Sequence, residues 1–423
     1  MSMRRPPKKN RIKLAADSVR IANLAQAVAQ SGSRLEDLSW QEQLDLLVAK
    51  TLKSQHQDLL DAASEHLFET HPNSYEVLME TMESLSTSCR LEYGSKFYDA
   101  MLIAAPVLAW TRFEIPSGSI SGEIITMVSA HMASHILADD AQLQILPTLY
   151  SIDQLPRSHC DTFALTEQLA LSLLKGAVLK PQHELPPTIP FLADIRYLLA
   201  VVVTPVLTPF FRWQLVKPPF DTTTAKSEIL AQWQENATPV VSRLLPGCGI
   251  ELLMPEAYYT VCREADIKIR PVSIRAAVFY LSNMLSVEPS ELSVVIAAFG
   301  NPDSNGQIDE YRVSFCVGNA PEVVYGVIWP IYQQDDQLTA IEADLGQLSQ
   351  LSQLSSTLAE SLLGEIPTVL AECGVLRVKK LDDIFAMEFC DDCGAPLFAA
   401  ADAELVHAEM PDDAPPQGSS HFH

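Results

Sequence analysis

The sequence predicts an α+β protein built in three parts. Repeated helix-start signals and long apolar stretches indicate an N-terminal all-α helical domain over residues 14–215. Short alternating segments over residues 245–380 indicate an α+β sandwich, in which one mainly antiparallel sheet packs against helices. A closely spaced cysteine pair with nearby histidines predicts a short, acidic, zinc-knuckle-like C-terminal tail over residues 381–423. The chain has 423 residues and is 48% hydrophobic, which is enough to bury substantial cores.

The helical half is expected from capping residues and apolar runs. Ser39 and Asn73 each have a glutamate three residues later, as in a capping box, where side chains satisfy free amides at a helix start. The segment 98–110 is apolar nearly all round, so we expect a central buried helix there. The apolar run 197–211 contains two prolines and is shorter than the roughly 20 residues of a membrane-spanning helix. We therefore predict that this run is buried in the protein.

The chain after about residue 245 alternates between expected strands and helices. Polar and apolar residues alternate along 309–317, and this segment is expected to form a hairpin with 322–330 across a short turn. The charged segment 262–271 is expected to be a solvated, salt-bridged loop. The other expected elements, in chain order, are a strand at 249–255, a helix at 270–285 opened by Pro271, a strand at 292–300, a helix around 356–372 and a strand at 374–380.

The net charge of −24 is unevenly distributed. Residues 1–13 carry six Lys and Arg side chains and no acid, and are expected to form a disordered basic arm. The acidic remainder repels polyanions, so nucleic acid binding is not expected except through this arm. Asp17 and Arg20 interrupt the apolar segment that a secretory signal would need, and no membrane association is expected. The eight cysteines are mostly scattered, which favours reduced thiols and a cytoplasmic location.

The segment "FCDDCGAPLF" has the residue spacing of half a metal site. Thiolates are soft donors suited to zinc, and Cys390 and Cys393 could bind one ion from a tight turn. Gly394 follows the second cysteine and allows the backbone to bend there. The pair specifies only two of the four ligands of a structural zinc site, and Cys373 is a spare candidate. An idle thiol pair in solvent and a redox dithiol are the alternative interpretations.

Histidines in the tail could complete this site. His407 follows Cys393 by 14 residues, and the chain ends with His421 and His423. We therefore predict a Cys2His2 zinc site that combines the cysteine pair with His407 and one of the two terminal histidines. Residues 381–423 contain ten acids and no Lys or Arg, which favours a cation without distinguishing between metals.

A second constellation lies in the helical half. His131, His135 and Asp139 are spaced one helical turn apart, a spacing that can chelate a metal. Met132 stands where a zinc protease helix would carry its glutamate. Both histidines continue an apolar stripe, so we expect them to be buried, hydrogen-bonded core residues, and metal or acid–base chemistry is the alternative. If these three residues do form an active site, His159 is a further weak catalytic candidate.

The ordered set of segments resembles one protein family. The segments are "SGSRLED", "APVLAWTRFEIPSG", "LYSIDQLPRSHC", "CREAD", "DEYRVSF", "VVYGVIWPIY" and "EFCDDCGAPLF…VHAEMP…HFH". Together they are similar to an uncharacterised bacterial family, domain of unknown function 2863, over almost the whole chain. The resemblance implies a cytosolic bacterial protein, and it supplies no catalytic residues because the family has no established activity.

The function is best interpreted as non-enzymatic. No phosphate-cradling glycine loop, nucleophile elbow or nucleotide fingerprint occurs in the sequence. We expect an interaction or scaffold protein with a structural zinc site and an unknown protein partner. One alternative is a metal-dependent hydrolase that uses His131 and His135. Another is an RNA- or ribosome-associated protein that binds through the basic arm.

Overall fold

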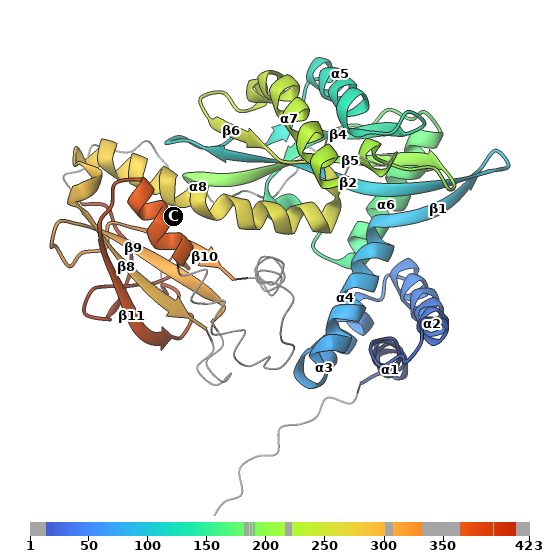
Figure 1. The fold of residues 1–423 in the computed structure, drawn as a ribbon, viewed down its shortest axis with the longest axis horizontal. Coiled ribbons are helices and arrows are strands. Elements are labelled where there is room, and N and C mark those ends of the chain that lie inside the picture. Colours follow the sequence, from blue (N-terminus) through green and yellow to red (C-terminus); the bar gives the residue numbers. More distant parts are fainter. Residues whose placement is uncertain are drawn as a thin grey trace, which may run out of the picture.

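A seven-stranded sheet and a four-stranded sheet, with one long helix packed against both, organise the chain (Figure 1). The computed structural model describes residues 14–181, 186, 188, 191–215, 222–300, 308–331, 364–391 and 393–411. The basic arm 1–13, the histidines His421 and His423, and the start of the helix expected at 356–372 lie outside the described residues. The α+β class predicted from the sequence is confirmed.

Four helices form an N-terminal bundle around one apolar core. They are α1 (Ala16–Ala29), α2 (Arg34–Lys53), α3 (Gln57–Thr70) and α4 (Pro72–Thr87). Helix α2 begins six residues earlier than the sequence predicts, and the Ser33 side chain caps it by accepting a 3.2 Å hydrogen bond from the Glu36 amide. The predicted caps at Ser39 and Asn73 are therefore wrong, since both residues lie inside helices.

The predicted all-α domain ends at Thr87, and a seven-stranded antiparallel sheet follows it. Its order is β1-β2-β5-β4-β3, and β6 and β7 also pair with β2. The strands are β1 (Ser88–Tyr93), β2 (Lys96–Trp110), β3 (Gly118–Ser119), β4 (Gln142–Tyr150), β5 (Ala193–Pro205), β6 (Gly249–Leu252) and β7 (Glu256–Ala257). The helix predicted at 98–110 is thus wrong, because this segment is the central strand β2.

The sequence of strand β2 predicts a helix because both faces of the strand are buried. Ile103 and Val107 point into one apolar core, whereas Leu102 and Leu108 point into the other. A strand covered on both sides has a nearly continuous apolar sequence, and periodicity cannot distinguish it from a buried helix. Most of the run 197–211 lies in β5, which is buried as predicted. The described chain contains no helix that is both long and apolar enough to cross a membrane.

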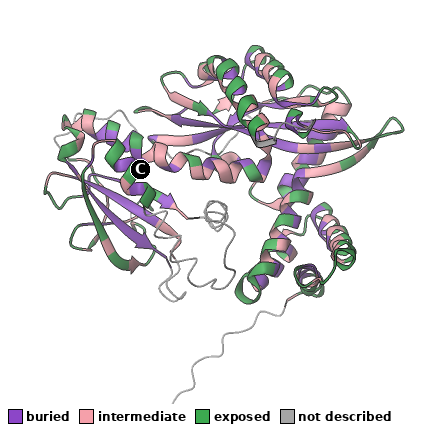
Figure 2. Ribbon diagram, in the orientation of Figure 1, coloured by how far each residue is buried: buried purple, intermediate pink, exposed green. Residues whose placement is uncertain are grey.

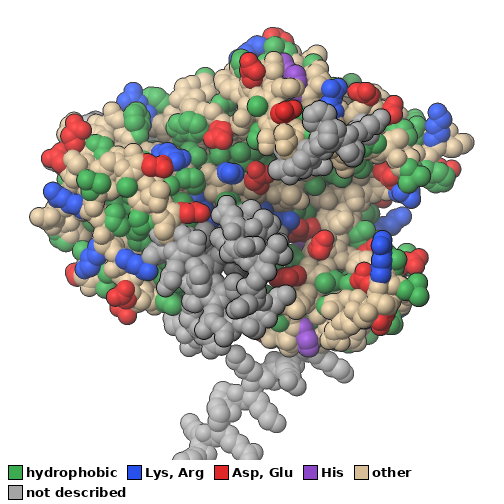
Figure 3. All heavy atoms as spheres, viewed as in Figure 1, with side chains coloured by type: hydrophobic (Ala, Val, Ile, Leu, Met, Phe, Trp, Pro, Cys, Tyr) green, Lys and Arg blue, Asp and Glu red, His purple; other side chains and the backbone are tan. Residues whose placement is uncertain are grey.

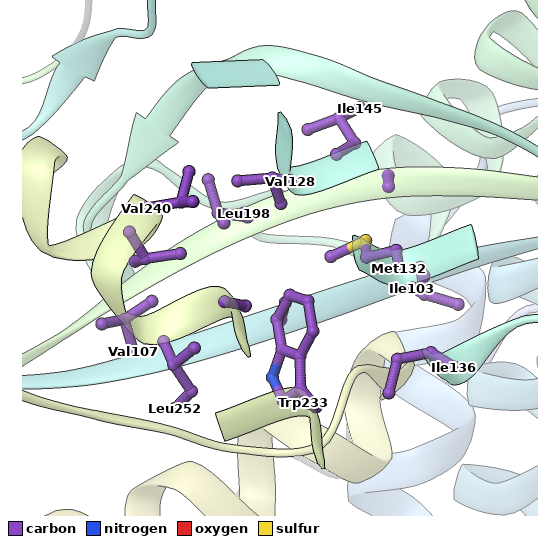
Figure 4. Close-up of a cluster of buried hydrophobic side chains, with 14 of the residues drawn as sticks. Ile103, Val107, Val128, Met132, Ile136, Ile145, Leu198, Trp233, Val240 and Leu252 are labelled. Carbon is purple, nitrogen blue, oxygen red and sulfur yellow. The ribbon is translucent and has the colours of Figure 1, made fainter. Parts of the chain in front are cut away.

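Helices cover both faces of this sheet (Figure 2). On one face lie α5 (Gly122–His131), the π-helical turn Met132–Ile136 and α7 (Thr222–Val241). The centre of that core is Trp233, which is fully buried and donates a 3.0 Å hydrogen bond from Nε1 to the Leu253 carbonyl (Figure 4). On the other face lie α6 (His159–Leu174) and the first half of α8 (Tyr258–Leu285).

The four-stranded sheet has the order β10-β9-β8-β11. Its strands are β8 (Leu292–Phe299), β9 (Glu310–Val317), β10 (Tyr325–Pro330) and β11 (Arg377–Phe385). Strands β9 and β10 form the predicted hairpin, and only β11 is parallel to its neighbour β8. A helix over 364–372 precedes β11, in agreement with the described part of the helix expected there. The mainly antiparallel sheet with helices is confirmed.

Helix α8 joins the two sheets and corrects the prediction for residues 262–271. These residues are helical, and Arg270 is 1% exposed, so the segment is not a solvated loop. Pro271 lies inside the helix and does not open it. The first half of α8 packs in a core with β2 and β5, and the half from Ile274 to Leu281 packs in a core with β8, β9 and β10.

Candidate metal centre

The cysteine pair lies in a tight turn of a short β-ribbon. We define the C-terminal ribbon as residues 388–391 and 393–409, which include β12 (Phe398–Ala399) paired with β13 (Leu405–Val406). At the turn, the Gly394 amide donates to the Cys390 carbonyl at 2.8 Å, and the Cys390 amide donates to the Ala395 carbonyl at 2.7 Å. These two bonds close the turn around the cysteines, so both thiols are presented from one loop.

Gly394 is required at this turn by its backbone conformation. Its φ of +73° lies in the left-handed region, which other residues adopt only with strain. Space is not the reason, because a Cβ atom at this position would meet no atom within 4 Å. The glycine predicted to allow the bend therefore does so through its dihedral angle.

Three ligand atoms converge at the ribbon. The Sγ atoms of Cys390 and Cys393 and a ring nitrogen of His407 all lie within 4.8 Å of one another, and this group could hold a metal ion. The Cys393 Sγ and His407 Nε2 atoms are 3.3 Å apart. Ligands at about 2.0–2.3 Å from a tetrahedral ion are separated by distances of this size. No other group of three potential ligands meets the same criterion in the described ranges.

A carboxylate orients the histidine of this group. The Nδ1 atom of His407 lies 3.1 Å from Glu409 Oε1, so the opposite ring nitrogen, Nε2, faces the two sulfurs. Histidines that bind metals usually make such a contact through their second nitrogen, which fixes the ring and raises its basicity. Cys393 is exposed, whereas Cys390 and His407 are half-buried. An ion at this position would lie at the surface of the ribbon.

Arg312 of strand β9 fastens the ribbon to the four-stranded sheet. Its side chain is fully buried, and Nη1 donates to the carbonyls of Glu388, at 2.9 Å, and Leu397. Its Nε atom pairs with Glu310 at 2.6 Å, and the guanidinium lies 4.1 Å from the centre of the Phe299 ring. Arg312 therefore connects the ribbon, through the carbonyls of Glu388 and Leu397, to strands β8 and β9 of the sheet.

Two further contacts hold the ribbon against the same sheet. The Ser314 hydroxyl donates to the Ala399 carbonyl at 2.7 Å, and the Glu409 amide donates to the Val323 carbonyl at 2.9 Å. Gly326 leaves room for the Phe398 ring, since an added Cβ would lie only 2.1 Å from it. The position of His407 relative to the cysteines is therefore set by contacts outside the metal group.

The comparisons with known proteins identify the family. The family model described as protein of unknown function (DUF2863) matches residues 6–422. The chain belongs to this family. No curated protein and no solved structure matches the chain. The resemblance found in the sequence is thus confirmed, and membership in DUF2863 brings no residue roles with it.

Among the described residues of this DUF2863 chain, the other histidines do not form a comparable group. His131 ends α5 and His135 lies in the π-helical turn, with their rings stacked 6.0 Å apart. Both are half-buried, because the buried stripe continues through Met132 and Ile136 instead. The expectation of buried core histidines is therefore wrong. Asp139 is 92% exposed and lies 3.4 Å from Arg212.

His159 lies on the opposite side of the seven-stranded sheet from these residues. It begins α6, whereas His131 ends α5 and His135 lies in the turn that follows it, on the other face. Burial lowers the pKa of the His159 imidazole, and the charges of Glu83 and Asp61 oppose this effect. The four weak catalytic candidates are thus not brought together. The spare ligand candidate Cys373 packs against the core of the four-stranded sheet and is not part of the metal group.

Proposed function

We propose that this protein binds one zinc ion through Cys390, Cys393 and His407, and that the ion is structural. The observation that supports this proposal is the convergence of two thiols and an imidazole whose other nitrogen contacts Glu409. Soft thiolate and imidazole ligands favour zinc over magnesium or calcium, which prefer oxygen ligands. His421 or His423 supplies the fourth ligand in this proposal.

The ion would close a ribbon that is too small to have a core of its own. The ribbon contributes Phe398 and Ala400 to a small apolar cluster with Cys316 and Val323. A bound ion would link the turn to the second strand of the ribbon, as structural zinc does in small modules. We infer that the protein is a non-enzymatic interaction or scaffold protein and that the ribbon is part of its interaction surface.

We also propose a cytoplasmic location, which the cysteine pattern supports. The negative charge supports the proposal that the described body of the protein does not bind nucleic acid. None of the eight cysteines, all of which are described, forms a disulfide, as expected in a reducing compartment. On the face shown in Figure 3, Lys and Arg side chains are scattered between acidic ones. Such a surface repels a polyanion at a net charge of −24.

The test is the metal content of the full-length, untagged protein by elemental mass spectrometry. We expect about one zinc per chain, as a four-ligand site implies. The variants Cys390→Ser and His407→Ala should lose it, and Cys373→Ser, the matched control, should retain it. Removal of both His421 and His423 should weaken zinc binding if one of them is the fourth ligand.

A structural role also requires that zinc stabilise the ribbon. Removal of zinc should increase amide exchange at Leu397 and Glu409, whose hydrogen bonds fix the ribbon. Protein that contains no zinc and takes none up, or zinc that survives in both ligand variants, would contradict the proposal.

A further inference from the structure

A cavity of about 520 Å³ lies where the seven-stranded sheet, helix α8, strand β10 and the C-terminal ribbon meet. Its lining is mostly apolar and includes Phe191, Ile269, Val327 and Phe398. This volume falls within the range of about 300–1,000 Å³ that is usual for small-molecule sites. The cavity lies between parts of the chain that are far apart in sequence, and small-molecule sites often lie between such parts.

One face of α8 supplies charged groups to this cavity. Asp266, Ile269, Arg270 and Ser273 line it and follow the i, i+3, i+4, i+7 spacing of a single helix face. Arg270 is almost fully buried, and its guanidinium lies 5.9 Å from the centre of the Trp329 ring. Burial raises the pKa of Asp266 to about 6. The positive charge of Arg270 opposes this increase in pKa, and the negative charge of Asp194 adds to it.

The charges that line the cavity are balanced in sign once the ion-pair partner of Asp194, which lies beside the cavity, is included. Asp194 also lines the cavity and is paired with the buried Arg196, and it accepts a hydrogen bond from the Ile195 amide at 2.8 Å. Asp266 has Arg270 one helical turn away. A ligand with a net charge would bring an uncompensated charge into an apolar site, which is costly. A ligand with one positive and one negative group avoids this cost.

Strand β10 gives the cavity a wall suited to a peptide backbone. It is the last strand in the order β10-β9-β8-β11, and within the described residues no strand pairs with its outer edge. The residues from Tyr325 to Ile328 line the cavity. Edge strands bind extended peptides through main-chain hydrogen bonds, and neighbouring pockets then select the side chains.

We propose that this cavity binds a short apolar peptide of dipeptide size, with its ammonium group at Asp266 and its carboxylate at Arg270. The peptide backbone would lie along β10, and its side chains would pack against the apolar lining. This inference goes beyond the zinc proposal. The ribbon forms one wall through Cys393 and Phe398, but the groups that recognise the peptide lie on α8.

The experiment is isothermal titration calorimetry of the zinc-loaded, full-length protein with the dipeptides that leucine and phenylalanine form. Binding of at least one of them is expected. N-acetylation of that dipeptide removes its ammonium group, and amidation removes its carboxylate. Each change should weaken binding by about tenfold or more, because a hydrogen bond to a charged group is lost. No heat from any of these dipeptides would overturn the proposal, as would equal binding of the acetylated form.

Variants of the protein locate the site. Asp266→Asn should weaken binding of the free dipeptide by about tenfold and leave the acetylated form unaffected. Asp382→Asn, an exposed aspartate on β11, is the matched control and should bind normally. Full affinity in Asp266→Asn would remove the assignment to this cavity. Zinc content is measured separately on the same samples, so failure of the zinc proposal and failure of this one are distinguishable.

Discussion

The replacement Arg312→Met tests how the ribbon is attached to the sheet. Methionine keeps much of the apolar volume but removes the charge and all donors. It leaves Glu310, whose side chain is only 14% exposed, without its ion pair. It also removes the donor from the carbonyls of Glu388 and Leu397. Breaking a buried ion pair in this way costs about 3–5 kcal/mol, so we expect the free energy of unfolding to fall by about 4 kcal/mol.

The assay is urea unfolding of the full-length protein at pH 7, followed by tryptophan fluorescence, with amide exchange at Leu397 as a local measurement. The matched control is Arg275→Met. Arg275 also pairs with a glutamate, Glu372, but both side chains are more than half exposed, at 51% and 56%. This exposed pair should contribute less than about 1 kcal/mol. Equal losses in the two variants, or unchanged exchange at Leu397 in Arg312→Met, would refute the reasoning.

Two further predictions concern packing and pH. Gly326→Ala places a Cβ 2.1 Å from the Phe398 ring and should cost about 1–3 kcal/mol in urea unfolding, whereas Gly364→Ala, where the added atom meets nothing within 4 Å, should be nearly neutral. Asp266 has a pKa of about 6 in the folded protein against an ordinary value of 3.8, so the folded state holds this proton more tightly than the unfolded chain. The stability that this provides is fully present below about pH 4 and is lost as the pH rises through 6. Asp266→Asn should therefore raise the free energy of unfolding at pH 7.5 by up to about 3 kcal/mol and have little effect at pH 4. A constant difference between variant and parent from pH 4 to 7.5 would contradict this assignment.

Strands β8, β9 and β10 of the four-stranded sheet were predictable because their signals are local. The alternation along β9, the short turn before β10 and the apolar sequence of β8 each reflect a strand with close neighbours in sequence. The seven-stranded sheet was not predictable in this way. Strands β2 and β5 are distant in sequence and are buried on both faces, so nothing in their sequence separates them from buried helices.

The metal group was likewise predictable from the sequence only in part. The spacing of Cys390, Cys393 and His407 was sufficient to predict that they would meet. Glu409, two residues after His407, could have been noticed as a partner for its second nitrogen. The role of Arg312 could not, because it depends on the ribbon folding over β9, more than 70 residues away in sequence.

Helix α8 also determines how the protein can be divided. Its two halves belong to different cores, although the helix runs for 28 residues without a break in its assignment and only Pro271, which has no N–H, interrupts its hydrogen bonding. A chain cut before Tyr258 would leave the seven-stranded sheet without part of the cover on one face. A chain cut after Leu285 would expose to water the half of α8 from Ile274 to Leu281, which otherwise packs with the four-stranded sheet. We therefore expect that neither sheet folds stably when it is expressed alone, and that the two sheets unfold together in one cooperative step. Both sheets then form a single folding unit.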